Sequence, residues 1–368
     1  MALITVTSTS PKSKISPNLP REAAPPDPQN CGGVRVSDVV GDRKRTLFRG
    51  RERNRLDIGT SCVVFALHCL CLFAPFQFNW SAFWVAFALY LITGLLGITL
   101  SFHRNLSHRS FKLPKWLEYS FAYCGVQAFQ GSPMDWVSVH RSHHQFVDSE
   151  RDPHSPIEGF WYSHMSWILY KKSINERCGE DNNVGDMKKQ PFYRFMQSTY
   201  DFHAIALAVL LYALGGFPFL VWGMGVRIVW VWHITWMVNS VCHVWGNQAW
   251  KTGDLSRNNW LVGVLAFGEG WHNNHHAFEY SARQGLEWWQ LDLTWFVVRL
   301  LQAAGLATEL KLPNEMQKQR MALQPLKNWR AGSSLPHGSC RPDLVGWKSQ
   351  PSPGRLHVQL QKQPKGAY

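Results

Sequence analysis

The sequence predicts an all-α integral membrane protein, with four transmembrane helices in two hairpins and a helical cap on the soluble side. Two observations support this fold class. The apolar residues are concentrated in two blocks, roughly 58–102 and 200–242, and each is long enough for two crossings at about 20 residues per crossing. Three histidine clusters flank these blocks. We therefore expect the cap to carry a histidine-rich metal site.

The net charge of the 368 residues is +13, a balance that often indicates binding to nucleic acid. Here the positive charge is concentrated before the first apolar block and in the last 44 residues. This placement is typical of membrane orientation and of contact with anionic headgroups, so we expect no nucleic-acid partner. The eight cysteines form no CxxC pair, which argues against a disulfide scaffold or a cysteine zinc site.

Residues 1–21 contain seven Ser or Thr, three basic residues and no acidic residue. This composition is typical of an organelle transit peptide, and the apolar core of a secretory signal is missing from it. A disordered tail is the alternative. We expect residues 1–55 to form a transit peptide and a disordered basic region, ahead of a membrane domain at 56–322. Seven basic residues end that region: Arg43, Lys44, Arg45, Arg49, Arg51, Arg53 and Arg55.

The first predicted hairpin consists of spans at 58–78 and 80–102, with a turn between Pro75 and Asn79. No charged residue lies at this turn. By the positive-inside rule the basic run stays on the other side of the membrane from the turn. The histidine cluster at 103–108 should therefore emerge on the same face as the N-terminus.

The second predicted hairpin consists of spans at 191–214 and 217–242, because residues 103–190 contain no run long enough to cross. Arg227 is unusual inside a span. Either it faces a polar cavity, or the fourth span starts near Ile228. Two hairpins return the chain to its starting side, which places all three histidine clusters on one face.

Three further segments have their own expected character. The short apolar stretch 122–129 suits a membrane-surface or re-entrant segment. Residues 286–306 carry apolar residues at helical spacing together with three Trp, which is typical of an interfacial helix. Residues 323–368 are rich in Gly, Pro and Ser, so we expect a disordered tail of unknown origin and assign it no function.

The histidine clusters have spacings that place several imidazoles on one helix face. The spacing HxxHH occurs twice and HxxxxH occurs once. The eight histidines concerned are His103, His108, His140, His143, His144, His272, His275 and His276.

Three residues outside the clusters are further candidates. His243 ends the fourth span at the level where the clusters gather, and Asn239, one turn earlier, could hold a metal-bound water. Asp152 lies in a polar run at 148–154, where it would contact a headgroup or support the imidazoles; a capped helix followed by a Pro turn is the alternative. His68 is expected to be hydrogen-bonded in packing. Seven histidines have no comparable spacing: His68, His154, His164, His203, His233, His337 and His357.

Eight or nine imidazoles at one membrane face need a common partner, because they would repel one another if charged and would lack partners if neutral and buried. One zinc site needs only about three or four ligands, so this number predicts two metal ions. Imidazole suits Zn, Cu, Fe and Ni alike. The apolar surroundings, without a Ser or Cys nucleophile motif, favour chemistry on a hydrocarbon. Such chemistry favours iron with dioxygen over redox-inert zinc.

These motifs resemble those of the membrane fatty-acyl desaturases. The resemblance is carried by HRNLSH at 103–108, HRSHH at 140–144, HNNHH at 272–276 and residues 239–243. The resemblance is to the stearoyl-CoA-type and plant acyl-lipid branch, and it covers roughly residues 55–322. The chain looks similar to the plastid subgroup that desaturates palmitoyl groups on monogalactosyldiacylglycerol at the delta-7 position. The stretches 179–186 and 222–243 carry the likeness to that subgroup.

The resemblance implies a di-iron enzyme with no catalytic residue beyond the metal ligands. A saturated acyl chain would receive a cis double bond, at delta-7 or delta-9, with dioxygen and two external electrons. No haem-binding HPGG occurs, so the donor would be a separate protein: ferredoxin in a chloroplast membrane, or cytochrome b5 in the endoplasmic reticulum. The implied iron ligands are His103, His108, His140, His143, His144, His243, His272, His275 and His276.

Three alternatives stay open at the level of sequence. A di-iron membrane lipid hydroxylase would use the same histidine clusters. A metal transporter would place histidines and carboxylates inside the spans near mid-bilayer, whereas here the clusters flank the spans. A structural or sensor protein that binds zinc would not need so many ligands.

Overall fold

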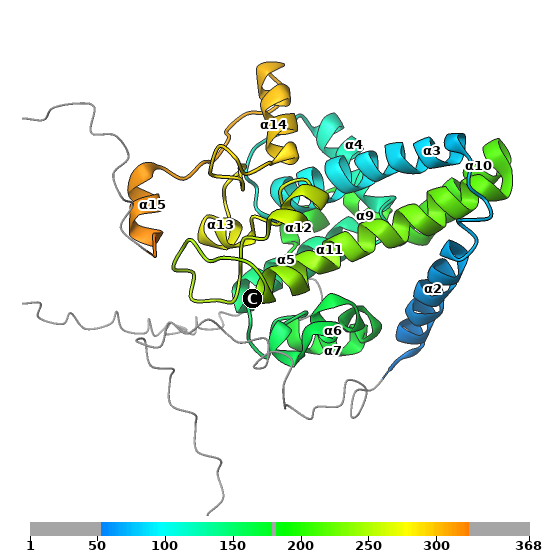
Figure 1. Ribbon diagram of the computed structural model, residues 1–368, viewed down its shortest axis with the longest axis horizontal. Helices are drawn as coiled ribbons and strands as arrows, with labels where there is room; N and C mark the ends of the chain where they lie inside the picture. The colour runs from blue at the N-terminus through cyan, green and yellow to red at the C-terminus, as the bar shows by residue number, and fades with distance from the viewer. Residues whose placement is uncertain (1–52, 179–181, 324–368) are drawn as a thin grey trace, which may run out of the picture. The chain divides into compact units, whose positions relative to one another are not determined.

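The computed structural model describes residues 53–178 and 182–323, and the regular secondary structure in this part is helical (Figure 1). The described residues form no β-strand, only isolated bridges such as that between Lys112 and Thr308. The predicted all-α fold class is thereby confirmed. The predicted tail and nearly all of the predicted transit and basic region lie outside the described residues.

One long apolar helix runs without interruption over Trp80–Ser107 and is long and apolar enough to cross a membrane. It begins as α3 (Trp80–Tyr90), capped by the Asn79 side chain, and continues as the π-helix η1 (Leu91–Ser107). The sequence placed the cluster at 103–108 beyond the span. The helix itself does not end at residue 102, because most of the cluster forms its last turns.

A second long apolar segment, Tyr200–Val244, meets the same criterion. It comprises α10 (Tyr200–Leu220), the π-helix η4 (Val221–Val226) and α11 (Arg227–Val244). The backbone is non-helical at Gly216, with φ 63° and ψ −155°, and the chain reverses there. Leu211, before the break, packs in one cluster with Met224, after it. The turn expected at 215–216, between the predicted spans 191–214 and 217–242, is therefore present.

The limits of the second hairpin differ from the prediction. Residues Pro191–Ser198 form a separate helix, α9, and the long segment starts only at Tyr200. Arg227 meets neither expectation, because the helix continues through it and its guanidinium is buried against backbone carbonyls. Its Nε donates to the Gly223 carbonyl at 2.8 Å, and its Nη1 donates to the carbonyl of Gln127.

Helix α2 (Arg55–Cys71) occupies the first predicted span but ends earlier than residue 78. It begins with a capping box, in which Asn54 and Asp57 satisfy each other's backbone N–H groups. At 17 residues it is shorter than the two long segments. Among the described residues only those two are long and apolar enough to cross a membrane.

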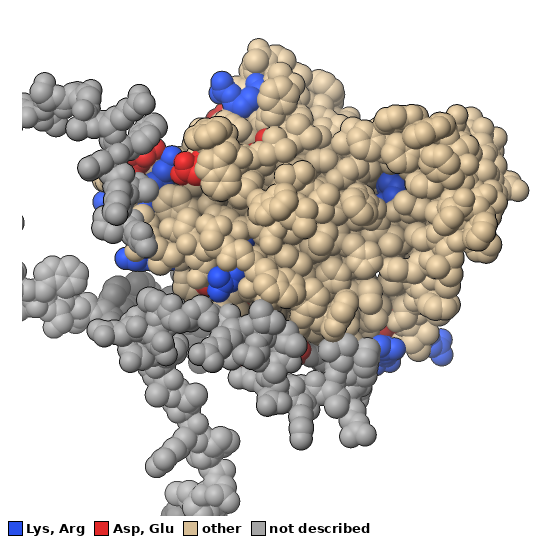
Figure 2. Space-filling model, viewed as in Figure 1, with Lys and Arg blue, Asp and Glu red and all other residues tan. Residues whose placement is uncertain are grey.

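Shorter helices surround the long ones. Charged side chains are sparse on the face over α3 and α10 (Figure 2). The shorter helices are α4 (Lys115–Val126), α5 (Pro133–Phe146), η2 (Pro156–Glu158), α6 (Phe160–His164), η3 (Ser166–Leu169), α7 (Lys171–Cys178), α8 (Gly185–Lys188), α12 (Trp260–Leu265), α13 (His272–Ala277), α14 (Leu293–Ala303) and α15 (Glu315–Met321).

Two of these helices refine the sequence expectations. The apolar stretch at 122–129 begins in the last turns of α4, where Ala122 and Val126 pack with Phe102 in the main apolar cluster. The interfacial helix expected at 286–306 is shorter, because α14 starts only after Asp292, whose side chain caps it. The same main cluster includes Met134 of α5, so it holds η1, α4 and α5 together beneath the histidines.

Candidate metal centre

Four elements bring the nine predicted histidines together. His103 and His108 lie at the end of η1, and His243 lies in the last turn of α11. The cluster at 140–144 lies in α5, and the cluster at 272–276 lies in α13, so both HxxHH motifs are helical as expected.

The nine imidazoles form two groups, and within each group one ring nitrogen per residue lies within 4.8 Å of all the others. Every predicted ligand belongs to one of them, although HxxHH neighbours in sequence are divided between them. The first group is His103, His108, His140, His144 and His275, and the second is His143, His243, His272 and His276.

Ring nitrogens face one another within each group. In the first, Nε2 of His275 lies 3.1 Å from Nε2 of His103 and 2.9 Å from Nε2 of His144. In the second, Nε2 of His272 lies 3.0 Å from Nε2 of His243 and 3.0 Å from Nε2 of His276. A ring nitrogen carries one hydrogen or one lone pair, so it cannot satisfy two such neighbours by hydrogen bonding.

Carboxylates around the two histidine groups determine which ring nitrogen of a contacting imidazole carries its hydrogen. Nδ1 of His143 lies 3.0 Å from Asp152, and Nδ1 of His243 lies 3.1 Å from Asp148. A carboxylate only accepts, so these Nδ1 atoms are the donors and the Nε2 lone pairs point inward. Three further contacts of this kind pair His276 with Asp254, His144 with Glu279 and His103 with Glu269.

Inward lone pairs at such short separations repel one another unless a cation lies between them. Two cations, one in each group, would satisfy all nine nitrogens, so the donor set fits two metal ions. Burial, together with the neighbouring imidazoles, holds the pKa of His140, His272 and His275 well below its ordinary value. These rings are therefore neutral, which is the form that binds a metal.

The supporting carboxylates were largely missed by the sequence reasoning. Only Asp152 was named, although Asp148 begins the same polar run. Glu269 precedes the last cluster by three residues, and Arg104 lies inside the first one. Arg104 is fully buried, and its Nη2 lies 2.9 Å from Glu269 and 2.9 Å from Asp292. A buried Arg inside a histidine motif was the signal that an acidic partner existed elsewhere in the chain.

His154 had no predicted role, yet it lies within the same region. Its ring centroid is 4.4 Å from that of His143, and the two histidines form a third possible metal-binding group with Asp152. Because Asp152 is already the partner of His143, this group shares its members with the second group.

A mostly apolar pocket opens beside the two groups. Its walls come from α3 and η1, from α11 and from residues 266–269, and histidines of both groups lie at one end. Asn239 lines this pocket, as do Trp136 and Phe267, so only a few of the many aromatic residues contribute. The lining residues are Tyr90, Gly94, Ile98, Thr99, His103, Trp136, His140, His143, Val231, Ile234, Thr235, Val238, Asn239, Ala266, Phe267, Glu269 and His272.

A hydrogen-bonded bridge crosses one side of this pocket. Nε1 of Trp136 donates to Oε1 of Gln130 at 3.1 Å, and the Gln130 amide donates to Thr235 at 2.9 Å. The bridge fixes an aromatic wall against α11 and stacks Trp136 on His140, with ring centroids 5.2 Å apart.

Fold and site together define a helical protein whose two histidine groups could hold metal ions beside a mostly apolar pocket. The fatty acid desaturase family matches residues 78–308, which include all nine histidines. The chain belongs to this family, and it is accordingly an oxidoreductase that acts on the acyl chains of lipids.

Three relatives illustrate the range of the family near this chain. The palmitoyl-monogalactosyldiacylglycerol delta-7 desaturase, chloroplastic, of Arabidopsis thaliana is 69% identical over 290 residues, 78% of each chain. An acyl-CoA 5-desaturase of Anemone leveillei is 57% identical, covering 78% of this chain and 90% of its own. Delta-9 acyl-lipid desaturase 1 of Arabidopsis thaliana is 55% identical, covering 77% of this chain and 92% of its own.

Proposed function

We propose that the protein is an acyl-lipid desaturase that inserts a cis double bond into a saturated acyl chain with dioxygen and two electrons from a separate donor. The observation that supports this most directly is the position of the two histidine groups at one end of an apolar pocket. A methylene chain in that pocket would lie against the metal ions. The site offers such a chain no Ser or Cys nucleophile among the pocket-lining residues.

The proposed metals are two iron ions, held by the nine histidines in groups of five and four. Bound iron would supply the redox chemistry with dioxygen that removal of hydrogen from an unactivated methylene requires. The reaction consumes one dioxygen, two electrons and two protons, converts CH₂–CH₂ into CH=CH and releases two waters. Asn239 lines the pocket beside His272 and is proposed to hold a water at the second group.

The residues of the chain itself orient and shield this chemistry. Asp152 and the four other carboxylates hold the Nδ1 hydrogens of five of the nine histidines, and so direct the Nε2 lone pairs of these five inward. The apolar walls exclude water from the acyl chain. The Trp136–Gln130–Thr235 bridge limits how the chain can pass α11, which is proposed to determine its path.

The substrate is proposed to be a palmitoyl group on a plastid galactolipid, desaturated at delta-7. This is the activity in the name of the relative that shares 69% identity. A delta-9 position is the alternative, because delta-9 acyl-lipid desaturase 1 shares 55%. The chloroplast membrane and ferredoxin as donor follow from the same relative's location and from the composition of residues 1–21.

The membrane arrangement is proposed to have four spans in two hairpins, within a domain at 56–322 that follows a transit and basic region at 1–55. Residues 323–368 are proposed to be a tail without a role in the reaction. The break at Gly216 divides Tyr200–Val244 into two limbs that pack together, which supports the second hairpin. Helix α2 followed by Trp80–Ser107 supports the first.

The decisive experiment is fatty-acid analysis, by lipid class, of cells that express the chain with and without residues 1–50. We expect a new C16 monoene on galactolipid that depends on plastid delivery. A monoene on other lipids that does not need residues 1–50 would place the enzyme in the endoplasmic reticulum, with cytochrome b5 as donor. Detection of a hydroxylated acyl chain would show that the protein is a hydroxylase and not a desaturase.

His272→Ala and His140→Ala serve as matched inactive variants, one from each histidine group. Both should insert into the membrane and yield no unsaturated product, because each removes a ligand from a site that needs every inward lone pair. Product formation by either variant would contradict the di-iron site.

A further inference from the structure

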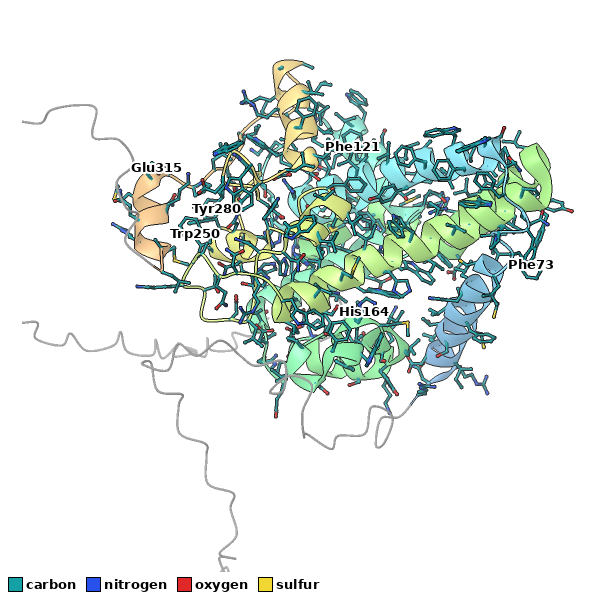
Figure 3. The ribbon with its side chains drawn as sticks, in the orientation of Figure 1. Phe73, Phe121, His164, Trp250, Tyr280 and Glu315 are labelled. Carbon is teal, nitrogen blue, oxygen red and sulfur yellow. The ribbon has the colours of Figure 1, made fainter. Side chains whose placement is uncertain are left out.

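Three imidazoles outside the metal groups form a continuous chain. His233 of α11 lies between His68 of α2 and His164 of α6, with ring nitrogens 3.1 Å and 3.0 Å apart. Beyond them, Nδ1 of His68 lies 2.7 Å from the carbonyl of Val64, and Nδ1 of His164 lies 2.9 Å from the hydroxyl of Ser240. We call His68, His164, His233 and Ser240 the imidazole seam. Figure 3 shows His164 beside α11.

The imidazole seam satisfies its own hydrogen bonds, unlike the two metal groups. The Val64 carbonyl can only accept, so Nδ1 of His68 carries a hydrogen and its Nε2 accepts one. His233 then donates to His68, and His164 donates to His233. The single hydrogen of the Ser240 hydroxyl is shared between Nδ1 of His164 and the Trp236 carbonyl, so each neutral ring has one donor and one acceptor in use. No cation is needed to explain these contacts.

Each end of the imidazole seam is hydrogen-bonded to a backbone carbonyl. One end is the Val64 carbonyl inside α2, and the other is Ser240 in α11, whose hydroxyl lies 2.8 Å from the Trp236 carbonyl. Among the described residues, no hydrogen bond continues it to the metal groups or to the surface. A route for protons is therefore not what this geometry provides. It provides polar links that join three helices.

The imidazole seam lies on the side of α11 that faces away from the pocket. Val231, Thr235 and Val238 of α11 line the pocket. At about 100° per residue, His233 and Ser240 of α11 point to the opposite side of this helix. One face of α11 therefore contacts the acyl chain in the proposed function, while the other is hydrogen-bonded to α6 and α2.

Hydrogen bonds fix the position of a helix along its axis more strictly than apolar packing does. Their distances vary over only a few tenths of an ångström, and a buried polar group without a partner costs free energy. A slip of α11 by one residue would move it by about 1.5 Å, which is close to the length of one carbon–carbon bond, about 1.5 Å. Such a slip would move the pocket wall relative to metals held mainly by η1, α5 and α13.

We propose that the imidazole seam is a positioning device, which fixes the axial position of α11 and thereby determines which pair of carbons is desaturated. This inference rests on the proposed desaturase function. His233 is the central member, because it alone contacts both of the other rings. None of the four residues is among the proposed metal ligands or lines the pocket.

The test compares double-bond positions in the products of three variants. His233→Phe keeps an aromatic ring and removes both links, and Ser240→Ala removes the link at the other end. His203→Phe is the control, because the hydrogen bond of His203 is to Thr199, the residue that precedes its own helix, and joins no second helix. Positions are determined by mass spectrometry of derivatised fatty acids, together with membrane-inserted protein and bound iron.

We expect the ratio of the main positional isomer to its neighbours to fall about 5- to 30-fold in His233→Phe and Ser240→Ala, equal to about 1–2 kcal/mol. The ratio in His203→Phe should equal that of the wild type. His233→Gln, which retains an amide donor and acceptor, should give a smaller change and also serves if the Phe variant does not accumulate.

Less product with an unchanged isomer ratio in both Ser240→Ala and His233→Gln would overturn the positioning role and leave a merely structural one. An equal shift in His203→Phe would overturn it as well, because any disturbed helix would then have the same effect. A wild-type protein that forms no double bond would overturn the proposed function itself, and this inference with it.

Discussion

Single carboxylates decide whether an imidazole can act as a ligand in this centre. Asp148 makes two contacts at once. One carboxylate oxygen lies 3.1 Å from Nδ1 of His243, and the other accepts from the Leu255 backbone N–H at 2.6 Å. An amide at this position has only one oxygen, so it cannot accept in both directions. If the Leu255 contact holds it, its NH₂ group faces His243 and favours the tautomer whose hydrogen is on Nε2.

Asp148→Asn should therefore weaken iron binding by about 10- to 100-fold, the usual effect of losing such a support. The measurement is iron retained per protein during titration with a chelator. Glu309→Gln is the control, because Glu309 is exposed and pairs only with Lys112 at 2.7 Å. Equal iron retention in the two variants would contradict the role assigned to Asp148.

At the level of single residues, the histidines of the site could be predicted from the sequence, whereas most of the supporting carboxylates could not. Eight of the nine histidines were found from spacing and His243 from its place at the end of the fourth span, and their two groups contain no other histidine. Their division between the groups was not predictable, since His143 and His144 are neighbours in sequence but belong to different groups. Four of the five carboxylates were also missed. Their partners lie between 22 and 166 residues away, and no local pattern encodes such contacts.

At the level of secondary-structure elements, the reversal of the chain at Gly216 requires a particular backbone conformation. Its φ of 63° and ψ of −155° lie in a region that is essentially restricted to glycine. A side chain there would be strained although its Cβ meets only Pro218, at 3.9 Å. The requirement is therefore one of backbone conformation and not of space.

Gly216→Ala should destabilise the protein by about 1–3 kcal/mol, and thermal unfolding in detergent should show a lower Tm. Gly59→Ala is the matched control, because Gly59 lies in α2 and an added Cβ meets nothing within 4 Å. That control should be neutral or stabilised by up to about 1 kcal/mol. Equal effects of the two substitutions would show that Gly216 needs no special conformation.

The ends of the elements were the least predictable part of the fold. Hydropathy places a helix end where polar residues begin, which is why residue 102 was taken as the limit of a span. The helix continues to Ser107 because Arg104 finds buried acidic partners in Glu269 and Asp292. Conversely, α14 begins late, because Asp292 caps it and the preceding segment is not helical.

For the whole molecule, the four-span arrangement makes a prediction about sidedness. After targeting to the endoplasmic reticulum, a glycosylation acceptor in a flexible loop inserted after Gln77 should be modified in the lumen. The same loop placed before Gly185, among the cap residues, should stay unmodified because the cap remains on the basic, cytosolic side. The measurement is the mobility shift removed by a glycosidase. Modification of the cap loop, or none after Gln77, would contradict two hairpins.

The fold class was predictable for the molecule as a whole because hydropathy is a property summed over long segments. The all-helical architecture and both turns at 75–79 and 215–216 agree with it. How the cap closes over the histidines was not predictable. That closure depends on contacts such as the hydrogen bond from Trp250 to Asn274, 2.8 Å long, between residues in different parts of the chain.

The ends of η1, α5 and α11 at the histidines have an electrostatic consequence of their own. Each helix contributes its last turn to the centre: His103 and His108, His143 and His144, and His243. The aligned peptide dipoles of a helix place a partial negative charge, about half an elementary charge, at its C-terminus. Three such ends meet here, so the backbone itself attracts cations to this end of the pocket.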